Sequence, residues 1–194
     1  MINLGNWFGK KDPDGAQEGL ADLRLDSMRI GDLVDYDLQT WQVTAASIYD
    51  YDGFPTQEWQ LTAGDEVRFL ERSEDDGKTD WTLTRSIDIG AIQEDVTGAI
   101  GENEDPPQVV HFESREYRAV ESDAGMQFVV AADGSTGGST GENAGREFVS
   151  WSYEARDEER VLFISQWGER RFTAYEGEPV NEYSFTDILP GGER

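Results

Sequence analysis

One aromatic and turn-rich pattern occurs twice in this chain, and it constrains the fold more than any other feature of the sequence. Residues 34–36 (VDY) align with residues 110–112 (VHF). The segment WQLTAGDEVRFLER, which begins at Trp59, aligns with WSYEARDEERVLFI, which begins at Trp151. Further aligned pairs are Trp41 with Tyr117, Gly77 with Gly168 and Trp81 with Phe172. Similar residues in the same order predict an internal duplication.

Each copy reads as a series of short strands separated by turns. Apolar and polar residues alternate in VDYDLQTWQVTA, which begins at Val34, and on both sides of the turn at 63–65 (AGD). A period of two is typical of strands, and Gly-containing turns between such runs are typical of β-hairpins. We therefore predict an all-β, mainly antiparallel fold with little helix, made of two tandem, related, small barrel-like or SH3-like β units packed as one compact protein.

Composition marks the segments between the strands. Residues 90–106 contain Gly, Pro and many acidic residues, which predicts a linker with one short helix. Residues 131–145 (AADGSTGGSTGENAG) carry no large apolar side chain, which predicts a mobile surface loop. The expected organisation is an N-terminal segment at 1–27 that forms a short helix or a tail, a first β repeat at 28–89, the linker at 90–106, a second β repeat at 107–189 and a tail at 190–194.

The charge of the chain limits its partners. It carries 41 acidic and 16 basic residues, a formal net charge of -25. Nucleic-acid binding depends on Lys and Arg that displace counterions, so we expect no nucleic-acid partner. The absence of Cys excludes disulfides, thiolate metal sites and Cys nucleophiles. The N-terminus lacks the apolar stretch of a signal peptide and no segment has the length of a membrane span, so we expect a cytoplasmic protein.

Aromatic and basic residues meet near the N-terminus. Trp7 and Phe8 precede Lys10 and Lys11, which are adjacent in an otherwise acidic chain. Such a segment can contact an anionic membrane surface, here the inner membrane face, or dock into the groove of another protein. The alternative is a tail or strand whose aromatic side chains fold back onto the domain. We favour this alternative, because a segment of about ten residues has only marginal membrane affinity.

Few residues of the chain suggest catalysis. His111 is the only His, so a Ser-His-Asp triad or a His-based zinc site has little to build on. No phosphate-binding loop of the Walker type and no dinucleotide fingerprint is present. Glu58, Asp65, Glu154 and Asp157 lie near the predicted hairpins, but nothing singles out a pair, and solvated surface acids are the simpler interpretation. We expect no cofactor, and a protein that is not an enzyme.

Two acidic turns are candidate calcium sites. Their candidate ligands are Asp50 and Asp52 in one turn, and Asp75, Asp76 and Asp80 in the other. An EF-hand loop needs a third side-chain ligand at position five and a Glu at position twelve. Counted from Asp50, these positions hold Phe54 and Leu61. Asp-Gly pairs between strands form turns readily, so we favour a turn over a metal site in both segments.

Aromatic side chains are the remaining candidates for a binding surface. Trp and Tyr are enriched where proteins bind one another. Trp59 and Trp151 occupy matching positions of the two copies, which favours packing in the core. The candidate interaction residues are therefore Trp7, Phe8, Phe54 and Trp167.

Several segments are similar to a known bacterial family. MRIGDLVDYDLQTWQVT, VHFESREYRAVE, FVSWSYEARDEERVLFISQWG and GEPVNEYSFTDILP resemble the family catalogued as domain of unknown function 4178. The most specific elements are residues 151–154 (WSYE) and the pair Trp167 and Gly168. The resemblance implies a bacterial accessory protein. Relatives are often encoded near phage-shock-type membrane-stress proteins and polyamine-synthesis genes.

Three functional hypotheses follow. The leading one is a non-enzymatic protein-interaction or adaptor module in a bacterial envelope-stress system, with a membrane-stress or membrane-associated protein as its partner. The first alternative is a protein that binds cations, either calcium or polyamines. The second alternative is a hydrolase that uses carboxylates or His111.

Overall fold

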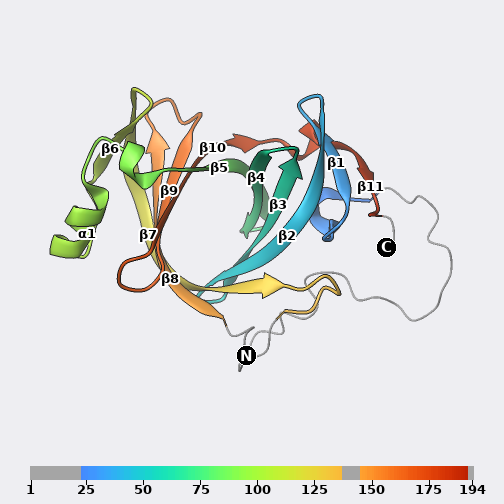
Figure 1. The fold of residues 1–194 in the computed structure, drawn as a ribbon, viewed down its shortest axis with the longest axis horizontal. Helices are drawn as coiled ribbons and strands as arrows, with labels where there is room; N and C mark the ends of the chain where they lie inside the picture. The colour runs from blue at the N-terminus through green and yellow to red at the C-terminus, as the bar shows by residue number, and fades with distance from the viewer. Residues whose placement is uncertain (1–22, 137–144, 192–194) are drawn as a thin grey trace.

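Strands make up most of the computed structural model, which describes residues 23–136 and 145–191 (Figure 1). The strands are β1 (Leu33–Tyr36), β2 (Gln39–Tyr51), β3 (Phe54–Ala63), β4 (Glu66–Asp75), β5 (Lys78–Ile87), β6 (Val109–Phe112), β7 (Arg115–Val130), β8 (Arg146–Ala155), β9 (Val161–Gln166), β10 (Phe172–Val180) and β11 (Thr186–Leu189). The helical elements are η2 (Leu25–Ser27), η3 (Ile89–Ala91), α1 (Val96–Asn103) and η4 (Glu182–Ser184). The predicted all-β class is confirmed.

The strands join in one antiparallel sheet that closes on itself. Its order is β11-β1-β2-β3-β4-β5-β10-β9-β8-β7-β6, and β2 also pairs with β7. This pairing closes β2–β5 and β7–β10 into one eight-strand barrel. The sequence predicts two separate barrel-like units, whereas the barrel takes strands from both. The long strands β2 and β7 extend past their short partners β1 and β6, and the edges left free there are satisfied by pairing with each other.

Each half of the barrel keeps a hydrophobic core of its own. One core contains Trp59 and the other Trp151, as the repeat predicts for these two side chains. Alternate residues of the strands point away from the cores. On β3, for example, Trp59 is buried in its core while Glu58 lies on the opposite face. The faces turned away from the cores meet inside the barrel, and we call the space between them the lumen.

The end of the chain returns to the first half. Strand β11 pairs with β1, with Leu189 opposite Leu33. Phe185 stacks on Tyr36 at a centroid distance of 4.5 Å and is buried in the core that contains Trp59. The apolar residues beyond β10, among them Phe185 and Ile188, thus complete the core of the first half.

The connecting segments follow local rules. Helix α1 lies within the linker, beside β6 in Figure 1, and buries Val96 and Ile100 against the core of the second half. The side chain of Asp95 caps its first turn by accepting from the Gly98 N–H at 2.9 Å. Residues 131–136 form a turn, while the rest of the predicted Gly/Ser loop lies almost wholly outside the described residues. No helix in the described part of the chain is long and apolar enough to cross a membrane.

Candidate ligand site in the barrel lumen

A cavity of about 260 Å³ lies in the lumen. Both halves of the barrel line it, through strands β2, β3 and β4 on one side and β7, β8 and β10 on the other. Its lining residues are Ala45, Ala46, Ser47, Tyr49, Glu58, Gln60, Phe69, Gln127, Arg146, Trp167, Arg171, Thr173 and Tyr175. A volume near 30 Å³ per water gives room for roughly eight or nine waters, so the cavity is large enough for a small ligand.

Aromatic side chains from opposite halves meet around this cavity. Phe69 on β4 contacts Tyr175 on β10 edge to face, with ring centroids 5.1 Å apart. Tyr49 on β2 meets Phe148 on β8 in the same way at 5.4 Å and lies 6.4 Å from Trp167. These contacts hold the two walls together and give the cavity aromatic faces.

Two carboxyl groups stand side by side on the wall of the first half. Glu58 on β3 and Glu71 on β4 are directly opposite each other in the hairpin register. Burial, together with the neighbouring Glu71, raises the pKa of Glu58 to about 8, although Tyr49 opposes this shift by hydrogen bonding. Burial raises the pKa of Glu71 to about 7. Neither carboxyl group forms an ion pair with any described residue.

A chain of hydrogen bonds runs across the lumen and ends at Glu58. The Gln127 side-chain amide on β7 donates to the Tyr49 hydroxyl at 3.0 Å and to the Ser47 hydroxyl at 3.3 Å. The Tyr49 hydroxyl donates in turn to Glu58 Oε1 at 3.1 Å. Burial and the nearby Glu58 raise the pKa of Tyr49 well above its usual value, so this hydroxyl keeps its proton. Glu58 is the final acceptor of the chain.

Two arginines also line the cavity. The Arg146 guanidinium lies over the ring of Trp167, 4.5 Å from its centroid. Arg171 lies in the β9–β10 turn that also carries Trp167. Arg146 and Trp167 also line a more open groove, which we call the outer groove, together with Asp50 and Asp123. The two residues therefore line both the cavity and the outer groove.

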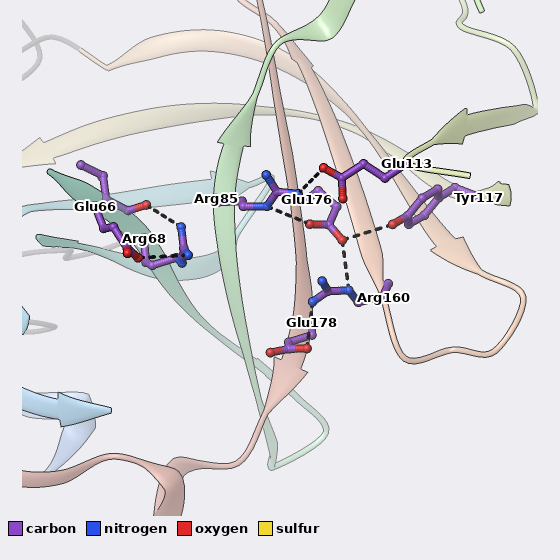
Figure 2. A network of polar contacts seen from close by, with 9 residues as sticks. Glu66, Arg68, Arg85, Glu113, Tyr117, Arg160, Glu176 and Glu178 are labelled. Carbon is purple, nitrogen blue, oxygen red and sulfur yellow. Dashed lines mark hydrogen bonds and ion pairs between the residues drawn. The ribbon is translucent and has the colours of Figure 1, made fainter. Parts of the chain in front are cut away.

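A second polar cluster lies on the other face of the sheet, where β5 meets β10. Figure 2 shows Glu176 between Arg85 and Arg160, with Tyr117 on one side. Both guanidinium groups contact the Glu176 carboxylate, at 3.2 and 3.1 Å, and the Tyr117 hydroxyl donates to it at 3.2 Å. We call this cluster of Arg85, Glu113, Arg160, Glu176 and Glu178 the seam. Every charge in it has a partner of opposite sign, including Glu113 with Arg85 and Glu178 with Arg160. The charged groups of the seam are thus already paired with one another, and the lumen is the better candidate for a ligand site.

Comparison with known proteins assigns the chain to a family. The model of the family described as Domain of unknown function (DUF4178) matches residues 29–182. The chain belongs to this family. It is also 24% identical over 181 residues, 93% of each chain, to a protein of Aquifex aeolicus (strain VF5) that is named "Uncharacterized protein". No solved structure matches. The matched region of this DUF4178 member includes every strand of the barrel, and it confirms the resemblance seen in the sequence.

The predicted interaction residues of this DUF4178 chain lie in different places. Trp167 lines the cavity and the outer groove. Phe54 begins β3 next to the β2–β3 turn, and 71% of its surface is exposed. Trp7 and Phe8 lie outside the described residues.

Both acidic turns have the geometry of hairpin turns. Asp52 and Gly53 have positive φ, and Asp50 accepts a hydrogen bond from the Gly53 N–H at 2.7 Å. The second turn has positive φ at Asp76 and Gly77, between Asp75 and Lys78, while Asp80 pairs with Lys78 at 2.8 Å. Within residues 23–136 and 145–191, no three His, Asp or Glu side chains are placed to bind one metal ion.

His111 lies on β6 and is not among the residues that line the cavity. Its Nδ1 is 2.7 Å from Glu94 Oε1, and its backbone N–H donates to the same carboxylate. Its Nε2 is 3.7 Å from Glu116. These contacts attach the segment before α1 to the edge strand β6, where they protect the edge.

The Glu58–Glu71 pair is the part of the site that the sequence interpretation misses. Glu58 is named there among surface acids, and Glu71 is not singled out. The signal is the two-residue hairpin turn at Gly64 and Asp65, which places Ala63 opposite Glu66 and hence Glu58 opposite Glu71. Register alone pairs the two carboxyls, but only barrel closure places them inside the protein.

Proposed function

We propose that this chain binds a small, positively charged ligand in the lumen of its barrel. The observation that carries the proposal is the Glu58–Glu71 pair. Glu58 lines the cavity, Glu71 stands directly opposite it on β4, and neither has a cationic partner among the described residues. Two desolvated carboxyl groups side by side are unfavourable when both are ionised, unless a positive charge compensates them. A cationic ligand supplies that charge.

The seam of the same protein supports this proposal by contrast. Glu176 is more deeply buried than either lumen carboxyl, with 3% of its surface exposed, and there the chain provides two guanidinium groups and a hydroxyl. At Glu58 it provides only the hydroxyl of Tyr49. The protein can therefore neutralise a buried carboxylate with its own cationic side chains. It does not do so for Glu58 and Glu71.

We also infer that the two runs of five strands are a duplicated unit. Support comes from features that recur 76 positions apart. The turn at Asp37 and Leu38 has positive φ at both residues, and the turn at Glu113 and Ser114 has φ values within 3° of them. Register shifts occur between Val43 and Ala45 and again between Ala119 and Glu121. In each run the first residue of that shift donates from its N–H to the residue eleven positions before it, Asp32 or Gln108.

The hairpin registers correct the ungapped alignment of the two copies. Trp59 is opposite Leu70, whereas Trp151 is opposite Ile164, so the second hairpin has a turn two residues longer. With this correction, the counterparts of Glu58 and Glu71 are Ser150 and Ser165, which also face each other across their strands. The proposed repeats thus differ at the lumen, where one wall carries carboxyls and the other hydroxyls.

Isothermal titration at constant ionic strength tests the cation proposal. The titrants are calcium, butylammonium, tetramethylammonium and, as an anion of similar size, butyrate. We expect saturable binding of at least one cation, none of butyrate, and loss of cation binding in the double variant E58Q/E71Q. The matched control is E121Q/E159Q, which removes the same charge from exposed positions. The proposal fails when no cation binds or when both double variants bind like the wild type.

The protein-interaction hypothesis remains a second candidate, because Phe54 exposes a large apolar side chain beside the outer groove that Asp52 lines. Capture of a specific partner by the wild type, and its loss in F54S, is the expected result. Tyr183 is exposed to a similar degree, so Y183S is the control. Equal capture by all three proteins contradicts a role for Phe54. The same proposal includes an envelope-stress component as the partner. It also includes a location at the inner membrane face.

A further inference from the structure

The hydrogen bonds of the lumen leave acceptors for a ligand. Gln127 donates to Tyr49 and to Ser47, and Tyr49 donates to Glu58 Oε1, so only one oxygen of the two carboxyl groups accepts a hydrogen bond from this network. Glu58 Oε2 and the Glu71 carboxyl accept no hydrogen bond from a described residue. A ligand that satisfies these atoms must donate hydrogen bonds as well as carry positive charge.

The donor set does not suit a hard metal ion. Calcium takes six to eight oxygen ligands, and magnesium demands octahedral geometry. On this wall two carboxyl groups and one phenol hydroxyl are near each other, and the Tyr49 hydroxyl is already engaged as donor and acceptor. No group of three metal-binding side chains forms there or elsewhere in the described chain.

The remaining walls suit an aliphatic cation. Phe69, Tyr175 and Tyr49 present aromatic rings to the cavity, and ring faces attract ammonium groups while they pack against methylenes. The cavity of about 260 Å³ admits a short chain but not a large ring system. Arg146 and Arg171 lie on the part of the lining near Trp167, which leaves the negative end of the cavity at Glu58.

We propose that the ligand is a protonated primary amine, whose ammonium group donates to Glu58 and Glu71 and whose aliphatic chain lies against Tyr49, Phe69 and Tyr175. This inference rests on the proposed cation site and narrows its ligand class. A primary ammonium has three N–H donors, which matches the acceptors that the two carboxyls offer. A quaternary ammonium has the same charge and no donor. The two cations therefore separate hydrogen bonding from charge alone.

The test compares butylammonium with tetramethylammonium and calcium by titration calorimetry at pH 8 and constant ionic strength. We expect butylammonium to bind at least about tenfold more tightly than either competitor. E58Q and E71Q should each weaken it by about tenfold or more, because each removes a charged acceptor. Y49F, which keeps the ring and removes the hydroxyl, should weaken it less. E121Q should bind like the wild type.

Each other outcome overturns the inference. Binding of calcium or tetramethylammonium as tightly as butylammonium, with the same dependence on Glu58, contradicts the amine and leaves the cation site intact. Butylammonium binding that is unchanged in both E58Q and E71Q contradicts the placement of the ammonium group. No binding by any cation contradicts the cation site itself. Glutamine matches the neutral form of each carboxyl, so we expect the variants to fold, and circular dichroism with thermal unfolding verifies this.

Discussion

Arg85 on β5 and Glu176 on β10 stand directly opposite each other, and Arg85 Nε donates to Glu176 Oε2 at 3.2 Å. This ion pair lies at one of the two places where the halves of the barrel join. Arg160 contributes a second contact to the same carboxylate from β9, at 3.1 Å. A single buried acid thus connects strands from both halves, as Figure 2 shows.

Replacing Glu176 with Ala should destabilise the protein strongly. E176A leaves Arg85, Arg160 and Tyr117 without their common acceptor, and loss of one partner from a buried charge network costs about 3–5 kcal/mol. Urea unfolding measures the change in free energy. E178Q is the control, because Glu178 is half-exposed and contacts only Arg160, so we expect a loss below about 1 kcal/mol. Equal losses in the two variants contradict a special role for Glu176.

Gly177 should be essential to the same seam. A Cβ at this position would collide with the backbone carbonyl oxygen of Leu83 and lie 2.7 Å from Thr84 Cα, on the paired strand β5. Backbone atoms of a paired strand cannot move aside without breaking the ladder, so G177A should cost at least about 2 kcal/mol. G101A in α1 meets open space and should be neutral or stabilise by up to about 1 kcal/mol. Thermal unfolding distinguishes them, and similar midpoints argue against close contact at Gly177.

Local sequence patterns predict where the strands and turns of this protein lie, but they do not predict which strands pair with each other. The alternation around Trp59 and the Asp-Gly pairs follow from side-chain direction and backbone preference, and both appear in the structure. Alternation does not say which strand lies beside which. The pairing of β2 with β7, of β5 with β10 and of β1 with β11 joins residues far apart in sequence, and no short-range signal specifies these neighbours.

Because the sequence does not specify which strands are neighbours, the candidate site is also difficult to find from the sequence. A strand with Trp59 on one face and Glu58 on the other is typical of a sheet that covers a core and faces water. Here the polar face is also enclosed, because closure of the one sheet into a barrel turns the polar faces of its two halves toward each other. Pattern therefore predicts the face on which Glu58 lies, and only topology decides that this face is interior.

Stability should fall as pH rises through the range in which the lumen carboxyls ionise. Their pKa values are about 8 and about 7 in the folded protein, against 4.5 ordinarily. Between pH 4.5 and 8 the folded protein holds protons that the unfolded chain releases, so unfolding becomes easier with each pH step. A pKa shift of one unit corresponds to about 1.4 kcal/mol, and we expect a total loss of at least ~2 kcal/mol.

Urea unfolding at pH 5 and pH 9 measures this loss. E58Q/E71Q should lose markedly less stability over the interval than the wild type, because its lumen no longer takes up protons. E121Q/E159Q carries the same charge and should follow the wild type, which separates the lumen from general repulsion in this acidic chain. A parallel decline in all three proteins contradicts the raised pKa values.

Amine binding should strengthen as pH rises from 6 to 9. At the lower pH, protons occupy Glu58 and Glu71 and compete with the ammonium group, whereas an alkylamine with a pKa near 10.4 stays charged throughout. The other ionisable groups around the pair change little in this range. Burial raises the pKa of Tyr49, Tyr51 and Tyr175 above the usual value of 10.0.

Titration calorimetry over this pH range gives the affinity. Repetition in buffers of different ionisation enthalpy gives the number of protons released as butylammonium binds. We expect net proton release at pH 7 that vanishes near pH 9, and an affinity gain of about tenfold or more over the range. E58Q and E71Q should release fewer protons. An affinity that is flat with pH, or proton release that persists unchanged in both variants, contradicts competition between the amine and protons at these two carboxyls.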